Sequence, residues 1–107
     1  MTRVAVMQWI RPGSQAAYVE AHRHVWPEVV ADTQAAGISN YTGFVGGPDG
    51  RLVVGYFETP DLDSATRALA QSDANTRWSR EIVPLMETGG DLSNGSMSFL
   101  TPIWRID

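Results

Sequence analysis

Three consecutive segments decide the fold of this chain: Ile38–Val45 (ISNYTGFV), residues 46–50 (GGPDG) and Leu52–Glu58 (LVVGYFE). The two outer segments are rich in β-branched and aromatic residues, which favour extended strands. The glycines, the proline and the aspartate between them are turn formers. The stretch therefore predicts a β-hairpin.

On the N-terminal side of this hairpin, Gly37 is a stop signal for a long helix predicted over residues 15–36. Pro27 lies inside the helical pattern and removes a backbone hydrogen bond, so we expect the helix to kink or restart just after Trp26. Residues 3–10 are β-rich and apolar on both alternating faces, which predicts a strand that is covered on both sides.

On the C-terminal side, two further helices are predicted. Asp61 or Asp63 caps a helix that runs through Ala70, and Asp73 caps a second helix that runs to about Met86. The glycine-rich residues 89–95 then predict a loop, and residues 97–104 predict a last strand.

The order strand, helix, strand, strand, helix, strand is that of a ferredoxin-like α+β sandwich, in which the helices cover one face of an antiparallel sheet. Apolar residues occur at both parities of the strands, for example Val6 beside Met7 and Val53 beside Val54. The second face would thus be an exposed apolar patch unless something covers it. A second copy of the chain would cover it, so we expect a homodimer.

Size and charge narrow the classes of function. A chain of 107 residues fits one domain, residues 1–107. Eight basic against 12 acidic residues give a net charge of −4 without a basic run, which argues against nucleic acid or an anionic membrane as partner. The chain has no cysteine, so disulfides and thiolate chemistry are excluded. Without a secretory or membrane-spanning apolar stretch, we expect a cytoplasmic protein.

Three side chains at a spacing of four mark one edge of the first predicted helix. Tyr18, His22 and Trp26 share an arc of about 80° on a helical wheel, beside the face expected to meet the core. That core face carries Ala17, Ala21, Val25 and Val29. A histidine is a general acid or base, a phenol donates or accepts a hydrogen bond, and an indole offers a surface for a sugar ring. Taken alone, the same spacing is also typical of an ordinary amphipathic edge, and Pro27 beside it favours a site.

Two further aromatic residues are candidates for the same site. Tyr41 opens the second predicted strand, and Trp78 lies in the last predicted helix, where each is either a core residue or a wall of a ligand site. His22 and His24 point apart on a helix, and no cluster with the spacing of metal ligands is present in the sequence. No phosphate-binding glycine loop is present either. We therefore expect neither a metal nor a cofactor.

The pattern as a whole resembles the L-rhamnose mutarotase family. The resemblance rests on Val6-Met7-Gln8, on Tyr18 with His22, on Trp26-Pro27-Glu28, on Gly37 followed by Asn40-Tyr41, and on Ser72-Asp73 leading to Arg77-Trp78. It implies a dimeric α/β barrel of two ferredoxin-like subunits. It also implies that His22 is the proton donor, that Tyr18 and Tyr41 contact the sugar, and that Trp78 helps to bind it.

The chain departs from the family pattern at two places. Ser79 stands where the family commonly has a second tryptophan, and Arg23-His24 replaces an Asn-Pro. The resemblance implies a carbohydrate isomerase that exchanges the α and β anomers of L-rhamnose or a related aldose. In such a reaction His22 would donate a proton to the ring oxygen and Tyr18 would orient or relay, while Trp26, Tyr41 and Trp78 would form the walls.

Two alternatives remain at this point. One is a cofactor-free cyclase or monooxygenase of a biosynthetic pathway on the same dimeric barrel, which would prefer apolar ligands to free sugars. The other is a non-catalytic ligand-binding module, which would bind a sugar without accelerating its anomerisation.

Overall fold

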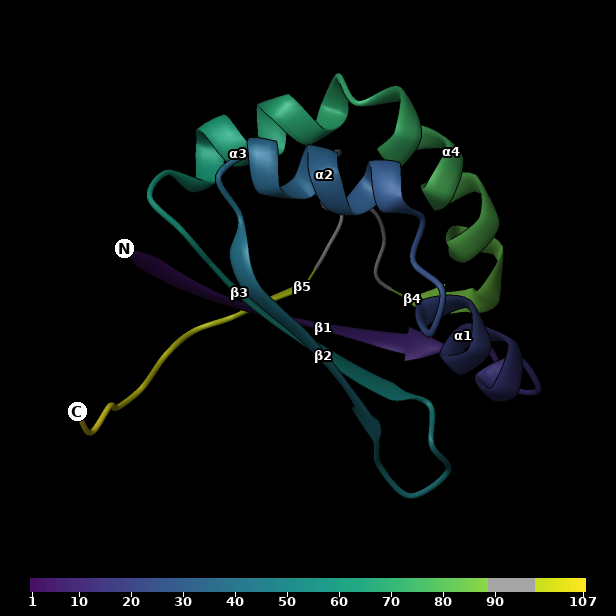
Figure 1. The fold of residues 1–107 in the computed structure, drawn as a ribbon. Helices are drawn as coiled ribbons and strands as arrows, with labels where there is room; N and C mark the ends of the chain where they lie inside the picture. Colours follow the sequence, from purple (N-terminus) through teal and green to yellow (C-terminus); the bar gives the residue numbers. More distant parts are fainter. Residues whose placement is uncertain (89–97) are drawn as a thin grey trace.

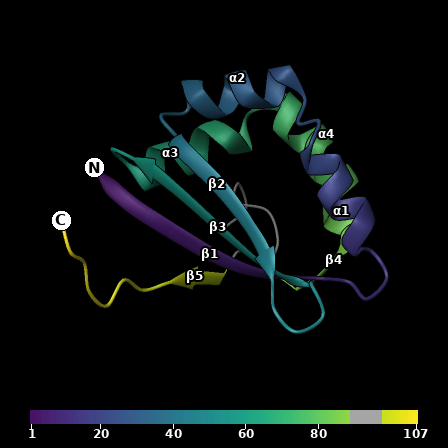
Figure 2. The ribbon, with the colours of Figure 1, turned by 60° about the horizontal axis from the view of Figure 1, so that its bottom comes forward.

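A curled antiparallel sheet forms one layer of the computed structural model, and the four α-helices lie over one face of it (Figures 1 and 2). The structure describes residues 1–88 and 98–107. The first half of the chain contains β1 (Thr2–Ile10), α1 (Gln15–His22), α2 (Pro27–Ala35), β2 (Ser39–Gly46) and β3 (Leu52–Thr59). The second half contains α3 (Leu62–Ala70), α4 (Asp73–Ile82), the 3₁₀ turn Val83–Leu85, β4 (Met86–Thr88) and β5 (Ser98–Leu100).

The strand order β2-β3-β1-β4, with β5 also paired to β1, confirms the predicted ferredoxin-like α+β sandwich. The centre of the sheet is the antiparallel pair β1–β3, which runs in register from Thr2 opposite Thr59 to Trp9 opposite Leu52. The predicted hairpin is present as β2 and β3, joined by the turn that follows Gly46.

Burial alternates along both central strands, as the two-residue period of a strand requires. The inner face, under the helices, divides into two apolar clusters. One cluster contains Val4, Val6, Ile38, Phe57, Ala65 and Leu69, and the other contains Ile10, Val53 and Met86. Tyr18 of α1 and Ile82 of α4 pack against the second cluster. The first cluster holds α3 on the sheet, and the second one anchors the end of the sheet where α1 lies.

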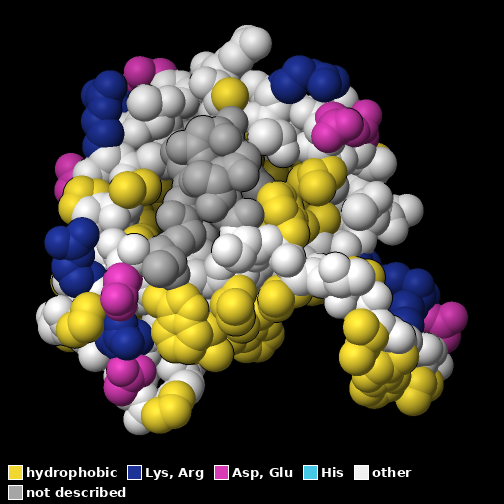
Figure 3. Space-filling model, turned by 180° about the vertical axis from the view of Figure 1, so that it is seen from behind, with side chains coloured by type: hydrophobic (Ala, Val, Ile, Leu, Met, Phe, Trp, Pro, Cys, Tyr) yellow, Lys and Arg dark blue, Asp and Glu magenta, His cyan; other side chains and the backbone are white. Residues whose placement is uncertain are grey.

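None of the described helices lies on the outer face of the sheet (Figures 1 and 2). Met7 and Val54 are directly paired there and only half buried, and Leu100 of β5 is 40% exposed. Beyond β5, residues 101–107 form an exposed C-terminal arm that includes Trp104, 74% exposed. In Figure 3 hydrophobic side chains gather along the lower edge of the molecule and on this arm, which projects at the lower right.

The first helical region restarts at Pro27, as predicted, but the break begins earlier than expected. The helix α1 ends at His22, and a second helix begins with Trp26 as N-cap and Pro27 in its first turn, where a proline has no intrahelical bond to lose. Gly37 follows α2 with φ +90°, the left-handed conformation of a helix stop.

The expected core face of this region is wrong for α1. No residue of α1 is fully buried, and Ala17 is exposed, whereas Val29 of α2 is buried. The helix α1 is short and lies at one end of the sheet, and it contacts the core through its largest side chain, the ring of Tyr18.

Three predictions for the C-terminal third need correction. The N-cap of α4 is Ser72 and not Asp73. The Ser72 hydroxyl accepts a hydrogen bond from the backbone N–H of Asn75, three residues later. The chain then turns at Val83–Leu85 into β4, an unpredicted strand. The expected strand over 97–104 is paired only at Ser98–Leu100, and the predicted loop at 89–95, like Met97, lies outside the described residues.

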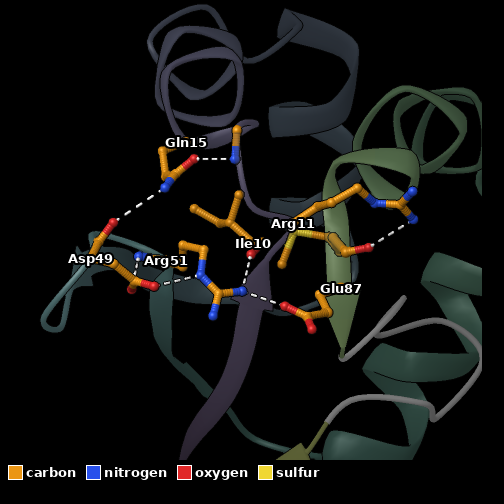
Figure 4. A network of polar contacts seen from close by, with 8 residues as sticks. Ile10, Arg11, Gln15, Asp49, Arg51 and Glu87 are labelled. Atoms are coloured by element: carbon orange, nitrogen blue, oxygen red, sulfur yellow. Dashed lines mark hydrogen bonds and ion pairs between the residues drawn. The ribbon is translucent and has the colours of Figure 1, made fainter.

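A polar network fixes the start of α1 relative to the hairpin turn (Figure 4). Arg51 donates to Asp49 (Nε–Oδ2 2.7 Å) and to the carbonyl of Ile10 (3.1 Å), and it also pairs with Glu87 of β4. Gln15, the first residue of α1, donates to the carbonyl of Asp49 at 3.2 Å. The Arg51 guanidinium holds the pKa of the Asp49 carboxyl below its usual value. The network ties together the turn, β1, β4 and α1.

Ser72 links α4 to α2, and this link gives a first prediction. The Ser72 hydroxyl accepts a hydrogen bond from the backbone N–H of Asn75 at 3.0 Å. It donates one to the carboxylate of Asp32 in α2 at 2.6 Å. We expect Ser72→Ala to lower the free energy of unfolding by about 1–2 kcal/mol, through loss of the cap and of the interhelical bond. Chemical denaturation measures this. The control is Ser39→Ala, an exposed serine of β2, for which a change within about 0.5 kcal/mol is expected. Equal stability of the two variants would contradict the role of Ser72.

Candidate functional site

A cavity of about 650 Å³ lies between the inner face of the sheet and the helices α1, α2 and α4. Its volume is in the range of small-molecule sites. Much of the wall is apolar, with valines from α1, α2, β2 and β3. The polar side chains that line it include Gln8, Tyr18, His22, Tyr41, Asn75 and Ser79. Four of the five predicted site residues line this one cavity: Tyr18, His22, Tyr41 and Trp78.

Two glycines open the floor of this cavity. Gly43 of β2 and Gly55 of β3 are directly paired, and both are among the lining residues. A Cβ on Gly55 would lie 3.2 Å from Val6 Cγ2 and 3.6 Å from Cε1 of the Tyr41 ring. A Cβ on Gly43 would meet nothing within 4 Å. Gly55 therefore makes room for the tyrosine ring, while Gly43 borders open space.

A bulge in β2 aims Tyr41 at the inner face. The register shifts between Ser39, opposite Glu58, and Thr42, opposite Tyr56, so that Asn40 and Tyr41 together occupy the position opposite Phe57. Asn40 takes the left-handed conformation, with φ +52°, which asparagine tolerates better than most residues. The ring of Tyr41 then lies 5.2 Å from that of Phe57.

His22 is held by the helix turn on which it sits. Its Nδ1 lies 2.8 Å from the backbone carbonyl oxygen of Tyr18, and its ring stacks on the Tyr18 ring at 4.2 Å between centroids. A carbonyl oxygen can only accept, so this contact requires a hydrogen on Nδ1. In the neutral imidazole the other nitrogen, Nε2, is consequently a proton acceptor, and in the imidazolium it is a donor.

Tyr18 is a neutral phenol over the whole physiological range. Burial, and to a smaller extent the nearby Tyr41 hydroxyl, raise the pKa of Tyr18 to about 12. Desolvation disfavours the phenolate, and a second phenol that could itself become negative adds to the effect. Tyr18 can thus donate or accept hydrogen bonds in the cavity, but it does not supply a negative charge.

Trp26 and Trp78 meet edge to face, and of these two side chains Trp78 is the one that borders the main cavity. The Trp78 ring meets the edge of His22 at 5.5 Å and that of Trp26 at 5.2 Å. Trp26 does not line the main cavity. It borders a shallower cleft on the outer side of the helices, and Arg77 lies 5.7 Å from its ring centre. The structure therefore places Trp26 behind Trp78.

No Asp or Glu is among the described residues that line the cavity. Glu58 of β3 lies on the outer face of the sheet. There it accepts from the Tyr56 hydroxyl at 2.8 Å and from the Asn40 amide at 3.1 Å, and the Tyr56 bond in particular lowers the pKa of Glu58. Glu28 pairs with Arg77 at 4.0 Å on the helix surface. Among the described residues that line the cavity, His22 is the only histidine.

Sequence reasoning missed the cavity floor. Gln8 is 6% exposed and lines the cavity from β1, and the Gly43–Gly55 pair lies beside it on the same face. Two features of the sequence could have indicated the floor. Gln8 is the one polar residue at the inward positions of the strand predicted over residues 3–10, beside Val4, Val6 and Ile10, and each of two strands contains a glycine in its interior.

The arrangement suits a small neutral ligand with hydroxyl groups. Apolar walls can meet C–H surfaces, the tyrosines and amides can hydrogen-bond to hydroxyls, and one histidine can exchange a proton. In the part of the chain that the structure describes, no group of three His, Asp or Glu side chains has the geometry to hold a metal ion. No described helix is long and apolar enough to cross a membrane.

Comparisons with known proteins agree on one family. The family model for L-rhamnose mutarotase matches residues 3–106. An L-rhamnose mutarotase of Oceanobacillus iheyensis is 29% identical over 107 residues, which is all of both chains. The crystal structure of an L-rhamnose mutarotase from Formosa agariphila superimposes with a TM-score of 0.79 at 19% identity, over all of both chains. An antibiotic biosynthesis monooxygenase shares the fold at a TM-score of 0.65 and 19% identity, over 96% of this chain and 99% of that one.

The glycine floor gives a second prediction. Gly55→Ala puts a methyl group against Val6 and the Tyr41 ring, so we expect a loss of about 1–3 kcal/mol in the free energy of unfolding and a shifted Tyr41 ring. Gly43→Ala, its cross-strand neighbour, has open space and should keep or slightly raise the stability. Denaturation and the NMR contacts between the Tyr41 and Phe57 rings measure both effects. Retention of those ring contacts in Gly55→Ala would show that Gly55 does not set the position of Tyr41.

Proposed function

The chain belongs to the L-rhamnose mutarotase family, and we propose that it uses the cavity under α1 to interconvert the α and β anomers of L-rhamnose. It is accordingly an isomerase that acts on a carbohydrate. The observation that carries the proposal for the cavity is the contact of His22 with Tyr18 and Trp78 at its wall.

In the proposed reaction His22 is the proton donor. The imidazolium gives its Nε2 proton to the ring oxygen of the pyranose while the anomeric hydroxyl loses its proton, the bond from C1 to the ring oxygen breaks, and an open-chain aldehyde forms. Rotation about C1–C2 exposes the other face of the carbonyl, and the reverse steps close the ring as the other anomer. The Tyr18 carbonyl accepts a hydrogen bond from Nδ1–H, so Nε2 is the ring nitrogen that remains for the proton exchange. General acid–base catalysis of this kind contributes about 10²–10⁴-fold.

Tyr18 acts here as a neutral group that orients or relays. A phenol with a pKa of about 12 cannot remove the anomeric proton as a phenolate near neutral pH. It can take up that proton while passing its own to a water molecule, so that Tyr18 stays neutral and the proton leaves the cavity with the water; the reverse transfer returns a proton when the ring closes. Tyr41, whose hydroxyl influences Tyr18, is the second sugar contact on the sheet side.

The indole of Trp78 is the proposed stacking wall for the apolar face of the sugar. Trp26 has an indirect part in this arrangement. Its edge contact with Trp78 from the outer side fixes the angle of that ring, and Arg77 in turn packs on Trp26.

The alternatives lose support from the family assignment. A cyclase or monooxygenase is compatible with the shared fold, but the likeness to a monooxygenase structure at 19% identity concerns the fold alone. A non-catalytic module is compatible with a cavity, but the chain belongs to a family of mutarotases.

The proposed assembly is a homodimer in which two sheets face each other. Support comes from the outer face, where no helix covers Met7, Val54 or Leu100, and from the exposed apolar side chains of the C-terminal arm. A second copy of the chain offers the same apolar surface, as two-fold symmetry requires. Residues 1–107 would be one catalytic domain in each subunit. A cytoplasmic location is proposed with it, because a chain without cysteine gains nothing from an oxidising compartment.

Removal of the imidazole tests the catalytic proposal. We expect His22→Ala to fold normally and to lose about 10²-fold or more of kcat for anomer exchange of L-rhamnose, because no carboxylate is among the described residues that line the cavity. Saturation-transfer NMR measures the exchange rate. The control is His24→Ala, which removes an exposed histidine that pairs with Glu20 on the surface of α1 and should leave the rate unchanged. Full activity of a folded His22→Ala variant would rule out His22 as the acid.

A charge on the outer face tests the assembly. Val54→Asp places a carboxylate opposite Met7 at the centre of the proposed interface, so we expect the dimer to dissociate into monomers at micromolar concentration. Sedimentation velocity across a dilution series measures the mass. Ala31→Asp, which introduces the same carboxylate on the exposed surface of α2, should remain dimeric. A wild-type chain that sediments as a monomer would refute the proposed dimer and would leave the catalytic proposal unaffected.

A further inference from the structure

One polar side chain interrupts the apolar inner face of β1. Val4, Val6, Gln8 and Ile10 all point inward and are nearly fully buried, and Gln8 is 6% exposed. Val6 belongs to one of the two apolar clusters and Ile10 to the other, so Gln8 lies between them. Its cross-strand neighbour is Val53.

The cavity reaches the same point of the sheet. Gln8, Val53 and Gly55 are all among its lining residues, so the amide borders the open space above the glycine floor. On the helix side, Tyr18 packs on the cluster that contains Ile10 and Val53. Gln8 is thus a buried amide on the wall opposite the histidine helix.

Burial of an amide among valines and isoleucines is unfavourable unless it makes hydrogen bonds. Gln8 takes part in an interaction within the chain. An amide offers two donor hydrogens and two acceptor lone pairs, so an internal partner and a ligand can be satisfied together. A sugar hydroxyl needs both a donor and an acceptor near it, and the same amide can supply either.

We infer that Gln8 is a specificity-determining residue of the site, which hydrogen-bonds one ring hydroxyl of the sugar from the sheet side. The inference rests on the proposed function, because it assumes a sugar in this cavity. Gln8 positions the substrate between the sheet and His22 and takes no part in the transfer of protons. Its removal therefore affects substrate binding more than the chemical step.

The substitution that tests this is Gln8→Met, which keeps an unbranched side chain of similar length and removes the amide. We expect a KM for L-rhamnose at least about tenfold higher, with a smaller change in kcat, because a hydroxyl buried without its partner is costly. The matched control is Gln71→Met, the same change at the exposed glutamine that caps the C-terminal end of α3. Gln71 is not among the residues that line the cavity, so KM should change less than about threefold.

Mono-deoxygenated derivatives of L-rhamnose separate a binding role from a structural one. For the derivative that lacks the hydroxyl bound by Gln8, wild type and Gln8→Met should have the same KM, whereas for the other derivatives the tenfold difference should persist. An equal KM for L-rhamnose in a folded Gln8→Met variant, or the same loss with every derivative, would overturn the inference.

A measurement on the unmodified protein covers the case in which Gln8→Met does not fold. The side-chain ¹⁵NH₂ resonances of Gln8 should shift when L-rhamnose saturates the site, and those of Gln71, which lies outside the cavity lining, should not. A Gln8 amide that does not respond to saturating sugar would overturn the inference. The wild-type exchange rate, measured on the same samples, reports separately whether the proposed mutarotation occurs.

Discussion

The antiparallel pairing of β1 with β3 is the constraint on which the rest of the molecule depends. Its register, from Thr2 opposite Thr59 to Trp9 opposite Leu52, fixes which side chain of every neighbouring pair faces the helices. A shift by one residue would move the whole inner set to the other face. The two core clusters, the cavity floor at Gly55 and the apolar outer face at Val54 all follow from this one register. The proposed substrate site and the proposed dimer interface accordingly lie on opposite faces of a single pair of strands.

The helix break at residues 23–26 has a comparable effect on the other wall of the cavity. A continuous helix from Gln15 would carry its valines and alanines along the sheet, as the sequence pattern suggests. Because α1 instead ends at His22 and a new helix begins at Pro27, α1 lies at the end of the sheet and presents Tyr18 and His22 to the cavity. The link from Gln15 to Asp49 and the contacts of Arg51 hold that short helix against the hairpin turn. The position of the histidine is thus determined as much by the termination of its helix as by the periodicity within it.

The sequence predicts the order of elements well because each strand and helix is marked locally, by β-branched runs, by caps and by Gly37 and Pro27. It also predicts four side chains that border the cavity, through the spacing of Tyr18 and His22 and through family resemblance for Tyr41 and Trp78. Trp26 follows the same spacing and yet lies behind Trp78, because the wheel loses its meaning where α1 ends. The face of Ala17 is misassigned for the same reason. The bulge at Asn40, the cross-strand meeting of Gly43 with Gly55 and the short β4 depend on pairing between distant segments, which no local pattern encodes.

The absence of carboxylates from the described lining of the cavity has a consequence for how a substrate arrives. Enzymes that attract charged ligands focus an electric field in a cleft and gain association rate at low salt. Here the proposed substrate is neutral, and no Asp or Glu lies opposite His22 and Arg23 in the described lining of the cavity. Arg23 pairs with Glu20 at 3.2 Å. Capture of the sugar therefore depends on diffusion and on the shape and hydrogen bonding of the cavity. The rate of association should accordingly change little with ionic strength.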